Sequence, residues 1–253
     1  MTTSPQHLTV ITGASRGMGL AMAEQLLDAG HALLCISRKS SESLAGRARL
    51  PGQLEQWNHD LARAETAAAK LETWLGARGE AGLSSATLIN NAGVLPRIAP
   101  LPDIGAGDLA DALRVDLEAP MLLAGAFLRA TSGWRCTRKV LNISSGLGRR
   151  AMASQAAYCA AKAGMDHFSR CVALEEAGKA NGARICSLAP GVIDTDMQVQ
   201  LRGADASRFP DIGNFIGMKE KGMLSSPPDA AARVLAFLAR PDFGANPVAD
   251  VRD

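Results

Sequence analysis

The sequence predicts an α/β fold, a single doubly wound parallel sheet with helices on both faces. Short apolar runs rich in β-branched residues alternate with longer helical patterns along the 253 residues, and a glycine-rich segment joins the first run to the first helical pattern. No linker, internal repeat or low-complexity segment breaks this alternation. We therefore expect one domain over residues 1–253.

The overall composition excludes several classes of protein. Hydrophobic residues make up 47% of the chain, enough for a full core, and the formal net charge of +2 is too small to indicate a nucleic-acid or membrane partner. No apolar run reaches the roughly 20 residues that span a bilayer, and the first residues lack the layout of a signal peptide. The five cysteines form no CxxC pair and the four histidines no HExxH motif, so we expect neither disulfides nor a metal site. These features together predict a cytoplasmic protein.

The first strand and helix are joined by the most informative turn. Leu8 to Thr12 is predicted as a buried strand, and TGASRGMG, Thr12 to Gly19, follows it and opens a helical pattern. Gly13 permits a tight turn, whereas Gly17 and Gly19 allow a pyrophosphate and the helix N-terminus to approach closely. Strand, glycine-rich turn and helix in this order indicate a dinucleotide site in a Rossmann-like fold, the alternative being an ordinary glycine-rich βα turn.

The second strand bears on the choice of dinucleotide. Ala32 to Ser37 reads as a strand, and Arg38 follows it directly. In a doubly wound sheet this strand end faces the adenosine ribose, where an acidic residue would select NAD. This chain has Ser37 and Arg38 there instead, with Arg16 in the first turn. Two guanidinium groups beside a 2′-phosphate predict NADP(H), the alternative being that both arginines are merely solvated.

The alternation continues to the end of the chain. The remaining predicted strands cover 53–58, 86–89, 139–144, 183–188 and 247–251, and the remaining predicted helices cover 62–77, 107–131, 155–179 and 230–239. Pro120 lies inside the helical pattern at 107–131 and predicts a kink or a local break there. Residues 198–223 show no firm period, and we interpret them as a mobile lid over the substrate.

Three side chains between Val140 and Lys162 can work as one chemical unit. Tyr158 is the only tyrosine, and Lys162 follows it by four positions in a helix-prone run, so both lie on one helix face. An ammonium at about 4 Å favours the phenolate by roughly 4 kcal/mol before desolvation, so we expect a lowered pKa and a usable general acid or base. Ser145 ends a strand-like run and can offer a hydroxyl to a carbonyl oxygen. The alternative is a tyrosine and a lysine on an exposed helix face.

With these motifs in order, the chain resembles the short-chain dehydrogenase/reductase family over nearly its whole length. The matching pieces are TGASRGMG, Asp60, NNAG at 90–93, Ser145, Tyr158 with Lys162, and Pro190-Gly191. Tyr158 follows Ser145 by 13 positions, the separation usual in that family. The segments NISSGLGRR, AAYCAAKAGMD, ALEE and APGVIDTDMQ are similar to the branch of sepiapterin reductases and bacterial benzil reductases. That branch reduces one carbonyl of a vicinal diketone with NADPH.

The resemblance implies a role for each catalytic side chain. Tyr158 would give a proton to the substrate oxygen, Ser145 would hydrogen-bond it, and Lys162 would hold the nicotinamide ribose and lower the pKa of Tyr158. Asp116 stands where the family usually has an asparagine that supports a proton relay behind the lysine. A carboxylate accepts the same hydrogen bonds but cannot donate when ionised, so the efficiency of that relay is open.

The resemblance also implies binding residues. The expected NADP(H)-binding residues are Gly13, Ser15, Arg16, Gly17, Met18, Gly19, Ser37, Arg38, Asp60, Leu61, Asn90, Ala92, Gly93, Tyr158, Lys162, Pro190, Gly191, Ile193 and Thr195. Ser145 and Asp250 are the expected substrate residues, although the more ordinary interpretation of Asp250 is a solvated residue of the tail.

The expected function is therefore NADPH-dependent reduction of a small carbonyl substrate by a homodimer or homotetramer. Two alternatives remain. One is an NADP-dependent alcohol dehydrogenase that works oxidatively, and the other is a nucleotide-sensing regulator with weak catalysis.

Overall fold

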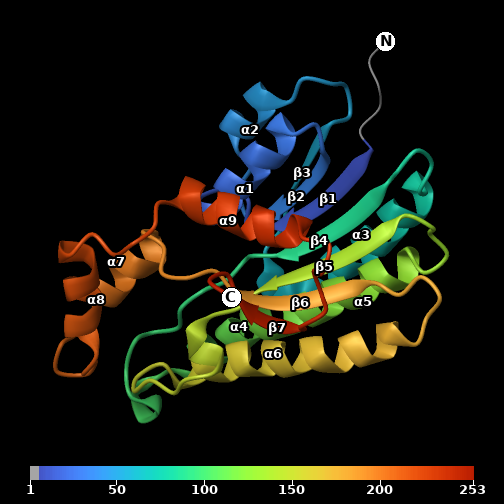
Figure 1. Ribbon diagram of the computed structural model, residues 1–253. Helices are drawn as coiled ribbons and strands as arrows, with labels where there is room; N and C mark the ends of the chain where they lie inside the picture. Colours follow the sequence, from blue (N-terminus) through green and yellow to red (C-terminus); the bar gives the residue numbers. More distant parts are fainter. Residues whose placement is uncertain (1–5) are drawn as a thin grey trace.

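The computed structural model describes residues 6–253, and its centre is one parallel sheet of seven strands in the order β3-β2-β1-β4-β5-β6-β7 (Figure 1). The strands are β1 (His7–Thr12), β2 (Ala32–Ser37), β3 (Leu54–Asn58), β4 (Ser85–Asn90), β5 (Thr137–Ile143), β6 (Arg184–Ala189) and β7 (Val248–Asp250). The α-helices are α1 (Gly17–Asp28), α2 (Glu42–Arg47), α3 (Ala64–Arg78), α4 (Ala106–Leu113), α5 (Ala119–Ala130), α6 (Ala156–Ala177), α7 (Asp196–Arg202), α8 (Ile212–Glu220) and α9 (Pro227–Ala239).

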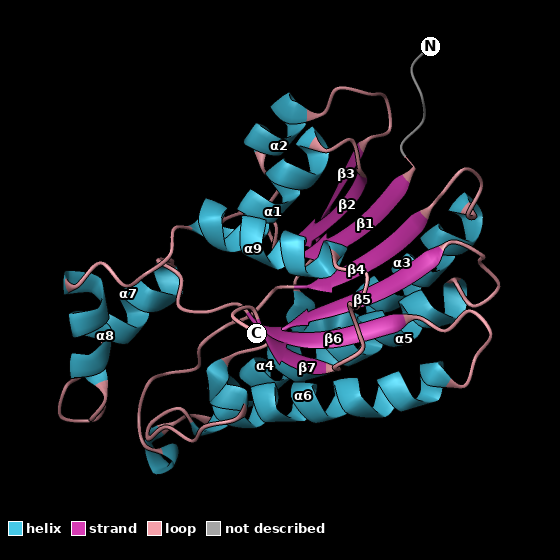
Figure 2. Cartoon of the chain, viewed as in Figure 1, coloured by secondary structure: helices cyan, strands magenta, loops and turns pink. Residues whose placement is uncertain are grey.

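Helices cover both faces of the sheet, as the sequence predicts. On one face α1 and α9 pack on a cluster that includes Met22 and Val234, and on the other α3, α5 and α6 pack on a cluster that includes Leu71 and Phe127 (Figure 2). The strands carry apolar side chains on both faces, so β2 is buried along its whole length. The predicted single doubly wound sheet is confirmed.

The strand order reverses beside β1, which pairs with β2 on one side and with β4 on the other. In a doubly wound sheet the crevice at such a reversal, outside the carboxyl ends of the strands, is where ligands bind. The glycine-rich turn follows β1 and the NNAG segment follows β4, so both lie at this crevice.

The break predicted at Pro120 is confirmed, because a π-helical turn at residues 114–118 divides the long pattern at 107–131 into α4 and α5, and Pro120 has no N–H to continue the α-helical ladder. The structure differs from the predicted elements in two places. Helix α2 was not predicted. Residues 198–223 contain most of α7 and all of α8, which pack together around Leu201, Phe209 and Phe215.

The final segment forms the expected edge strand. β7 pairs in parallel with β6 and brings the chain end to the carboxyl side of the sheet (Figure 1). Among residues 6–253, every helix falls short of the length and apolarity that crossing a membrane requires.

Candidate active site

The structure brings Ser145, Tyr158 and Lys162 together at the carboxyl end of β5. Tyr158 and Lys162 project from the first turns of α6 and are buried, and the Lys162 Nζ lies 5.5 Å from the centroid of the Tyr158 ring. Lys162 Nζ also donates to the carbonyl of Ile143 at 3.1 Å, which fixes the ammonium between the helix and the strand. The Ser145 hydroxyl lies beside the Tyr158 phenol, close enough to influence its pKa.

The acidity of Tyr158 differs from the expectation. Burial raises its pKa above the usual value, the Asp116 carboxylate raises it further, and the Ser145 hydroxyl lowers it. Desolvation of the phenolate therefore sets the direction of the shift, which is opposite to the lowered pKa predicted from the helix spacing of Tyr158 and Lys162. Near neutral pH the phenol keeps its proton, which is the state of a general acid.

Asp116 lies in the π-helical turn and is completely buried. Its Oδ1 accepts from the Val94 N–H at 2.9 Å, while its Oδ2 has no partner in the part of the chain that the structure describes. Burial raises the pKa of this carboxyl to about 6, against the opposing effects of Lys162 and the Val94 N–H. A Cβ on Gly93 would lie 3.1 Å from Asp116 Oδ1, so the glycine leaves the space that the carboxylate occupies.

The sequence did not point to Asp166, whose carboxylate joins several segments around the site by hydrogen bonds. Its Oδ1 accepts from the hydroxyls of Ser144 at 2.6 Å and Ser187 at 2.7 Å. Its Oδ2 accepts from Arg149 Nε at 3.3 Å. These bonds tie β5, β6 and α6 together immediately beside Ser145. The sequence feature that could have identified Asp166 is its spacing, since it follows Lys162 by four residues and so lies on the same face of the helix.

Gln155 was missed as well. It precedes Tyr158 by three positions and is buried, yet neither its amide oxygen nor its amide nitrogen has a partner among residues 6–253. Buried amides normally find partners, so this side chain is ready to bond a water or a ligand.

The glycine-rich turn packs tightly against the end of β4. A Cβ on Gly13, whose φ is +70°, would lie 2.9 Å from Ala92 Cα, and a Cβ on Gly19 would lie 2.2 Å from the Gly13 carbonyl oxygen. Asn91 Nδ2 donates to the carbonyls of Thr12 at 3.0 Å and Gly13 at 3.3 Å, which ties the end of β4 to the end of β1. Side chains at these glycines would block the turn.

No described side chain caps the N-terminus of α1, which leaves its first N–H groups facing the crevice. Ser15 beside it is half-buried, and Met18 packs into the core. This cradle fits a pyrophosphate, because free N–H groups and the positive end of the helix dipole both favour an anion.

The residues expected around the adenosine lie at the ends of β2 and β3. Ser37 is buried, and its Oγ accepts from the Ala14 N–H at 2.9 Å, whereas Arg38 is exposed. Asp60 is exposed and accepts from the Ala62 N–H at 3.1 Å, with Leu61 buried beneath it.

The guanidinium of Arg16 forms a salt bridge, since its Nη1 lies 2.7 Å from Asp196 Oδ2. Asn90 also has a partner inside the protein, because its Nδ2 donates to Asn142 Oδ1 at 2.8 Å. The amide nitrogen of Asn90 therefore joins β4 to β5, whereas its Oδ1 has no partner among residues 6–253.

The last of the expected NADP(H)-binding residues lie in the segment that follows β6. Pro190 leads into Gly191, whose φ of +84° turns the chain sharply. Ile193 forms a parallel bridge with Ser225, and the Thr195 hydroxyl donates to the Ile193 carbonyl at 3.4 Å. These bonds hold the segment at the mouth of the crevice.

Asp250 lies in β7 with its side chain largely buried, but its carboxylate is already paired. Its Oδ1 accepts from Arg252 Nε at 2.6 Å and its Oδ2 from Arg252 Nη2 at 2.7 Å. The hydrogen bonds with Arg252 hold the pKa of this carboxyl below its usual range. A substrate group could bind Asp250 only in competition with this arginine.

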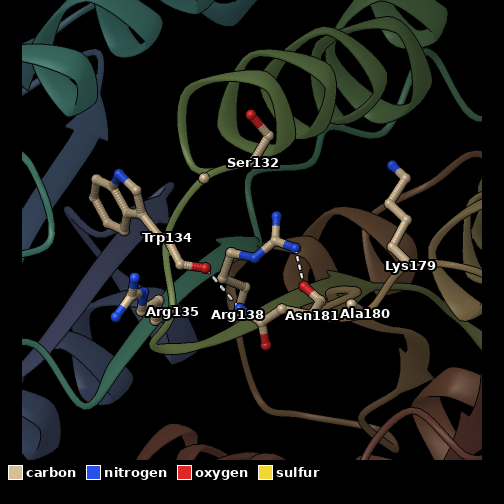
Figure 3. A pocket seen from close by; sticks show the side chains of 8 residues that line it. Ser132, Trp134, Arg135, Arg138, Lys179, Ala180 and Asn181 are labelled. Carbon is tan, nitrogen blue, oxygen red and sulfur yellow. Dashed lines mark hydrogen bonds between the residues drawn. The ribbon is translucent and has the colours of Figure 1, made fainter.

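A cavity of about 320 Å³ lies away from this crevice, near the amino ends of the strands (Figure 3). Trp134, Arg138 and Asn181 line it, and Arg138 Nη2 donates to the Asn181 carbonyl. Helices α5 and α6 both end beside it, so the positive charges of Arg138 and Lys179 complement the negative ends of two helix dipoles. Arg138 and Lys179 both form ion pairs with the Glu176 carboxylate, so these two cations already have partners inside the protein.

Comparisons with known proteins identify the family. The model of the short chain dehydrogenase family matches residues 7–206. A benzil reductase ((S)-benzoin forming) of Bacillus cereus is 34% identical over 241 residues, covering 92% of this chain and 94% of that protein. Sepiapterin reductase of Xenopus tropicalis is 32% identical over 247 residues, covering 91% of this chain and 90% of that one. The crystal structure of a short-chain dehydrogenase/reductase from Burkholderia vietnamiensis, 34% identical, superposes with a TM-score of 0.67 over 99% of each chain.

These matches extend over the crevice, the glycine-rich turn and the segment from Ser145 to Lys162, so the resemblance predicted from the sequence is confirmed. The chain belongs to the short-chain dehydrogenase/reductase family and is an oxidoreductase of carbonyl and alcohol groups with a fold that binds nicotinamide cofactors.

Proposed function

We propose that this protein is an NADPH-dependent carbonyl reductase that reduces one carbonyl of a vicinal diketone. The observation that carries the proposal is the buried phenol of Tyr158, whose pKa is raised by burial, beside Ser145 and Lys162. The 34% identity with a benzil reductase of Bacillus cereus supports the diketone as the substrate class.

The three side chains supply the groups that a reduction needs. When bound, NADPH supplies the hydride that reduces the carbonyl carbon. The Ser145 hydroxyl donates a hydrogen bond to the carbonyl oxygen and holds it beside Tyr158. Tyr158 then gives its proton to that oxygen as negative charge develops there, so the product is an alcohol. Lys162, fixed by the Ile143 carbonyl, stabilises the phenolate that remains.

Three features of the crevice support NADPH as the cofactor. The turn at Gly13 and Gly19 offers a pyrophosphate cradle. Arg38 follows β2 without an acidic residue that would accept from a ribose 2′-hydroxyl. Arg16 supplies a second guanidinium from the turn itself, and two guanidinium groups suit a 2′-phosphate.

Residues 198–223 are proposed as the lid over an apolar substrate. Phe209 and Phe215 pack there with Leu95 and Ile98, which follow β4, and with Met152, which precedes α6. The Ser154 hydroxyl hydrogen-bonds the Arg208 carbonyl and so joins the lid to the segment that carries Tyr158. An apolar enclosure of this kind favours an aromatic or aliphatic diketone over a strongly charged substrate.

A homodimer or homotetramer also remains part of the proposal. Leu174 on α6 is 79% exposed and Met121 on α5 is 43% exposed. Large apolar side chains in that position favour an interface with a second copy. Light scattering of the purified protein tests this point.

The experiment is a test of NADPH consumption. Purified protein is mixed with NADPH, and the loss of its absorbance is followed on addition of benzil and a panel of small diketones, with Tyr158→Phe as the control. Turnover of diketones by the wild type alone supports the proposal. Turnover only in the reverse direction, from an alcohol with NADP⁺, would favour the oxidative dehydrogenase, and cofactor binding without turnover in either direction would favour the regulator.

A further inference from the structure

Two segments that lie 180 positions apart in the sequence meet at the mouth of the crevice. Arg16 in the glycine-rich turn donates from Nη1 to Oδ2 of Asp196, the first residue of α7, at 2.7 Å. Directly beside this contact, a Cβ on Gly17 would lie 3.5 Å from the Thr195 Cγ2. The start of α7 therefore rests on the turn that forms the phosphate cradle.

The two charged groups have no other ion-pair partner in the described part of the chain. The neighbouring carboxylate of Asp194 is bound to the lid instead, because it pairs with Lys219 and Arg202. Both partners of the Arg16–Asp196 pair are about two-thirds exposed, so a solute anion has access to the guanidinium. Exposed ion pairs stabilise weakly, and a phosphate can displace a carboxylate from this arginine.

We propose that Asp196 is a determinant of cofactor specificity, because it occupies the guanidinium of Arg16 that a cofactor's 2′-phosphate must take over. The inference rests on the proposed use of NADPH. NADH carries a hydroxyl at that position and does not compete for Arg16. Asp196 therefore weakens the binding of NADPH selectively and narrows the preference between the two cofactors.

The test is the affinity of each cofactor, measured by isothermal titration calorimetry without any substrate. Asp196→Asn removes the competing charge and should tighten NADPH two- to five-fold, with a smaller change for NADH. Arg16→Gln should weaken NADPH, and adding Asp196→Asn to that variant should leave the NADPH-to-NADH ratio unchanged, because the group under competition is gone. Asp242→Asn is the matched control, since Asp242 is also exposed and pairs with an arginine at 2.9 Å, away from the crevice.

Circular dichroism and thermal unfolding confirm that each variant is folded before titration. The inference is overturned if Asp196→Asn shifts both cofactors equally, if it weakens NADPH, or if it acts as strongly in the Arg16→Gln protein. A wild-type protein that binds NADH as tightly as NADPH would contradict the proposed cofactor instead. In that case a gain of NADPH preference in Asp196→Asn would still support the role of Asp196.

Discussion

Asp116 and Lys162 both reach the same small space beside Gly93. A Cβ on that glycine would lie 3.1 Å from Asp116 Oδ1 and 3.8 Å from Lys162 Nζ. The carboxylate influences both members of the catalytic pair, since Lys162 lowers the pKa of Asp116 while Asp116 raises the pKa of Tyr158. The charge of a completely buried acid is therefore coupled to the proton donor.

Asp116→Asn is expected to leave the enzyme active and to move its pH profile. Asp116 is ionised above about pH 6, and removing its charge lowers the pKa of Tyr158. Oxidation of the hydroxyketone product needs the Tyr158 phenolate, so the pH of half-maximal oxidation should fall in the variant. The measurement is the oxidation rate with NADP⁺ as a function of pH. An unmoved profile would show that the two groups are uncoupled, and complete inactivation would mean that the carboxylate has another role.

The same residue predicts how stability depends on pH. Burial raises the pKa of Asp116 from 3.8 to about 6. The stability that protonated Asp116 contributes is therefore fully present below its pKa in the unfolded chain, and it is lost as the pH rises through its pKa in the folded protein. Over the whole pH range in which Asp116 titrates, this contribution to the free energy of unfolding falls by about 3 kcal/mol, and about 2 kcal/mol of that loss occurs between about pH 4.5 and about pH 7.5. Urea unfolding of wild type and Asp116→Asn at these two pH values should show the wild type losing about that much relative to the variant. A parallel dependence in both proteins would contradict the raised pKa.

Most of the fold could be predicted from local patterns in the sequence. The apolar runs that became β1 and β2, and the glycine-rich turn between β1 and α1, depend on neighbours in the sequence. Helices α7 and α8 did not show in the pattern, because their stability comes from a cluster around Phe209 and Phe215 that forms only in the folded chain.

The same distinction applies to the site. Ser145, Tyr158 and Lys162 follow one another closely enough for their spacing to predict a shared site. The contacts of Asp166 and Asp196 could not be predicted from the sequence. Asp166 accepts hydrogen bonds from the hydroxyls of Ser144 and Ser187, and Asp196 pairs with Arg16 of the glycine-rich turn, so both depend on residues far away in the chain. Sequence spacing gives no information on such contacts between distant elements.

Tyr158→Phe is expected to reduce turnover by about 10²–10⁴-fold or more while NADPH still binds, because only the proton donor is removed. Lys162→Ala should damage both turnover and cofactor affinity, since the ammonium bonded to the Ile143 carbonyl is lost from the same site. Steady-state rates and calorimetric titration with NADPH separate the two effects. A Tyr158→Phe protein that keeps a substantial fraction of its turnover would end the assignment of the general acid.

Arg38→Asp is expected to move cofactor preference toward NADH. Losing a charge-assisted contact with a 2′-phosphate costs about 1.5–3 kcal/mol, and a carboxylate at this position can accept from a ribose 2′-hydroxyl. The ratio of kcat/KM for NADPH and NADH should therefore fall by about 10- to 100-fold. Lys39→Asp is a matched control, since Lys39 is the next exposed cation along the chain. Equal effects of the two substitutions would show that only the overall charge matters.

Asp250 offers the sharpest test of the substrate class. Its carboxylate is bound at both oxygens by Arg252, whose own side chain is 77% exposed. If Asp250 anchors a ring N–H of a polar heteroaromatic diketone, Asp250→Asn should raise KM for that substrate and leave KM for benzil almost unchanged. Arg252→Ala should then lower KM for the polar substrate, because the competing guanidinium is gone.

The alternative is that Asp250 and Arg252 only hold the end of the chain in place. The Arg252 N–H also donates to Asp250 Oδ1 at 3.1 Å, so the pair closes a turn directly after β7. In that case Asp250→Asn and Arg252→Ala should both lower the unfolding temperature and affect the two substrates alike. Both substitutions break the ion pair between the Arg252 guanidinium and the Asp250 carboxylate, while Arg252→Ala keeps the backbone N–H that closes the turn. Opposite effects of the two substitutions on KM for the polar diketone therefore cannot arise from loss of the ion pair alone. The directions of the two changes in KM therefore distinguish a residue that binds substrate from one that only holds the chain end in place.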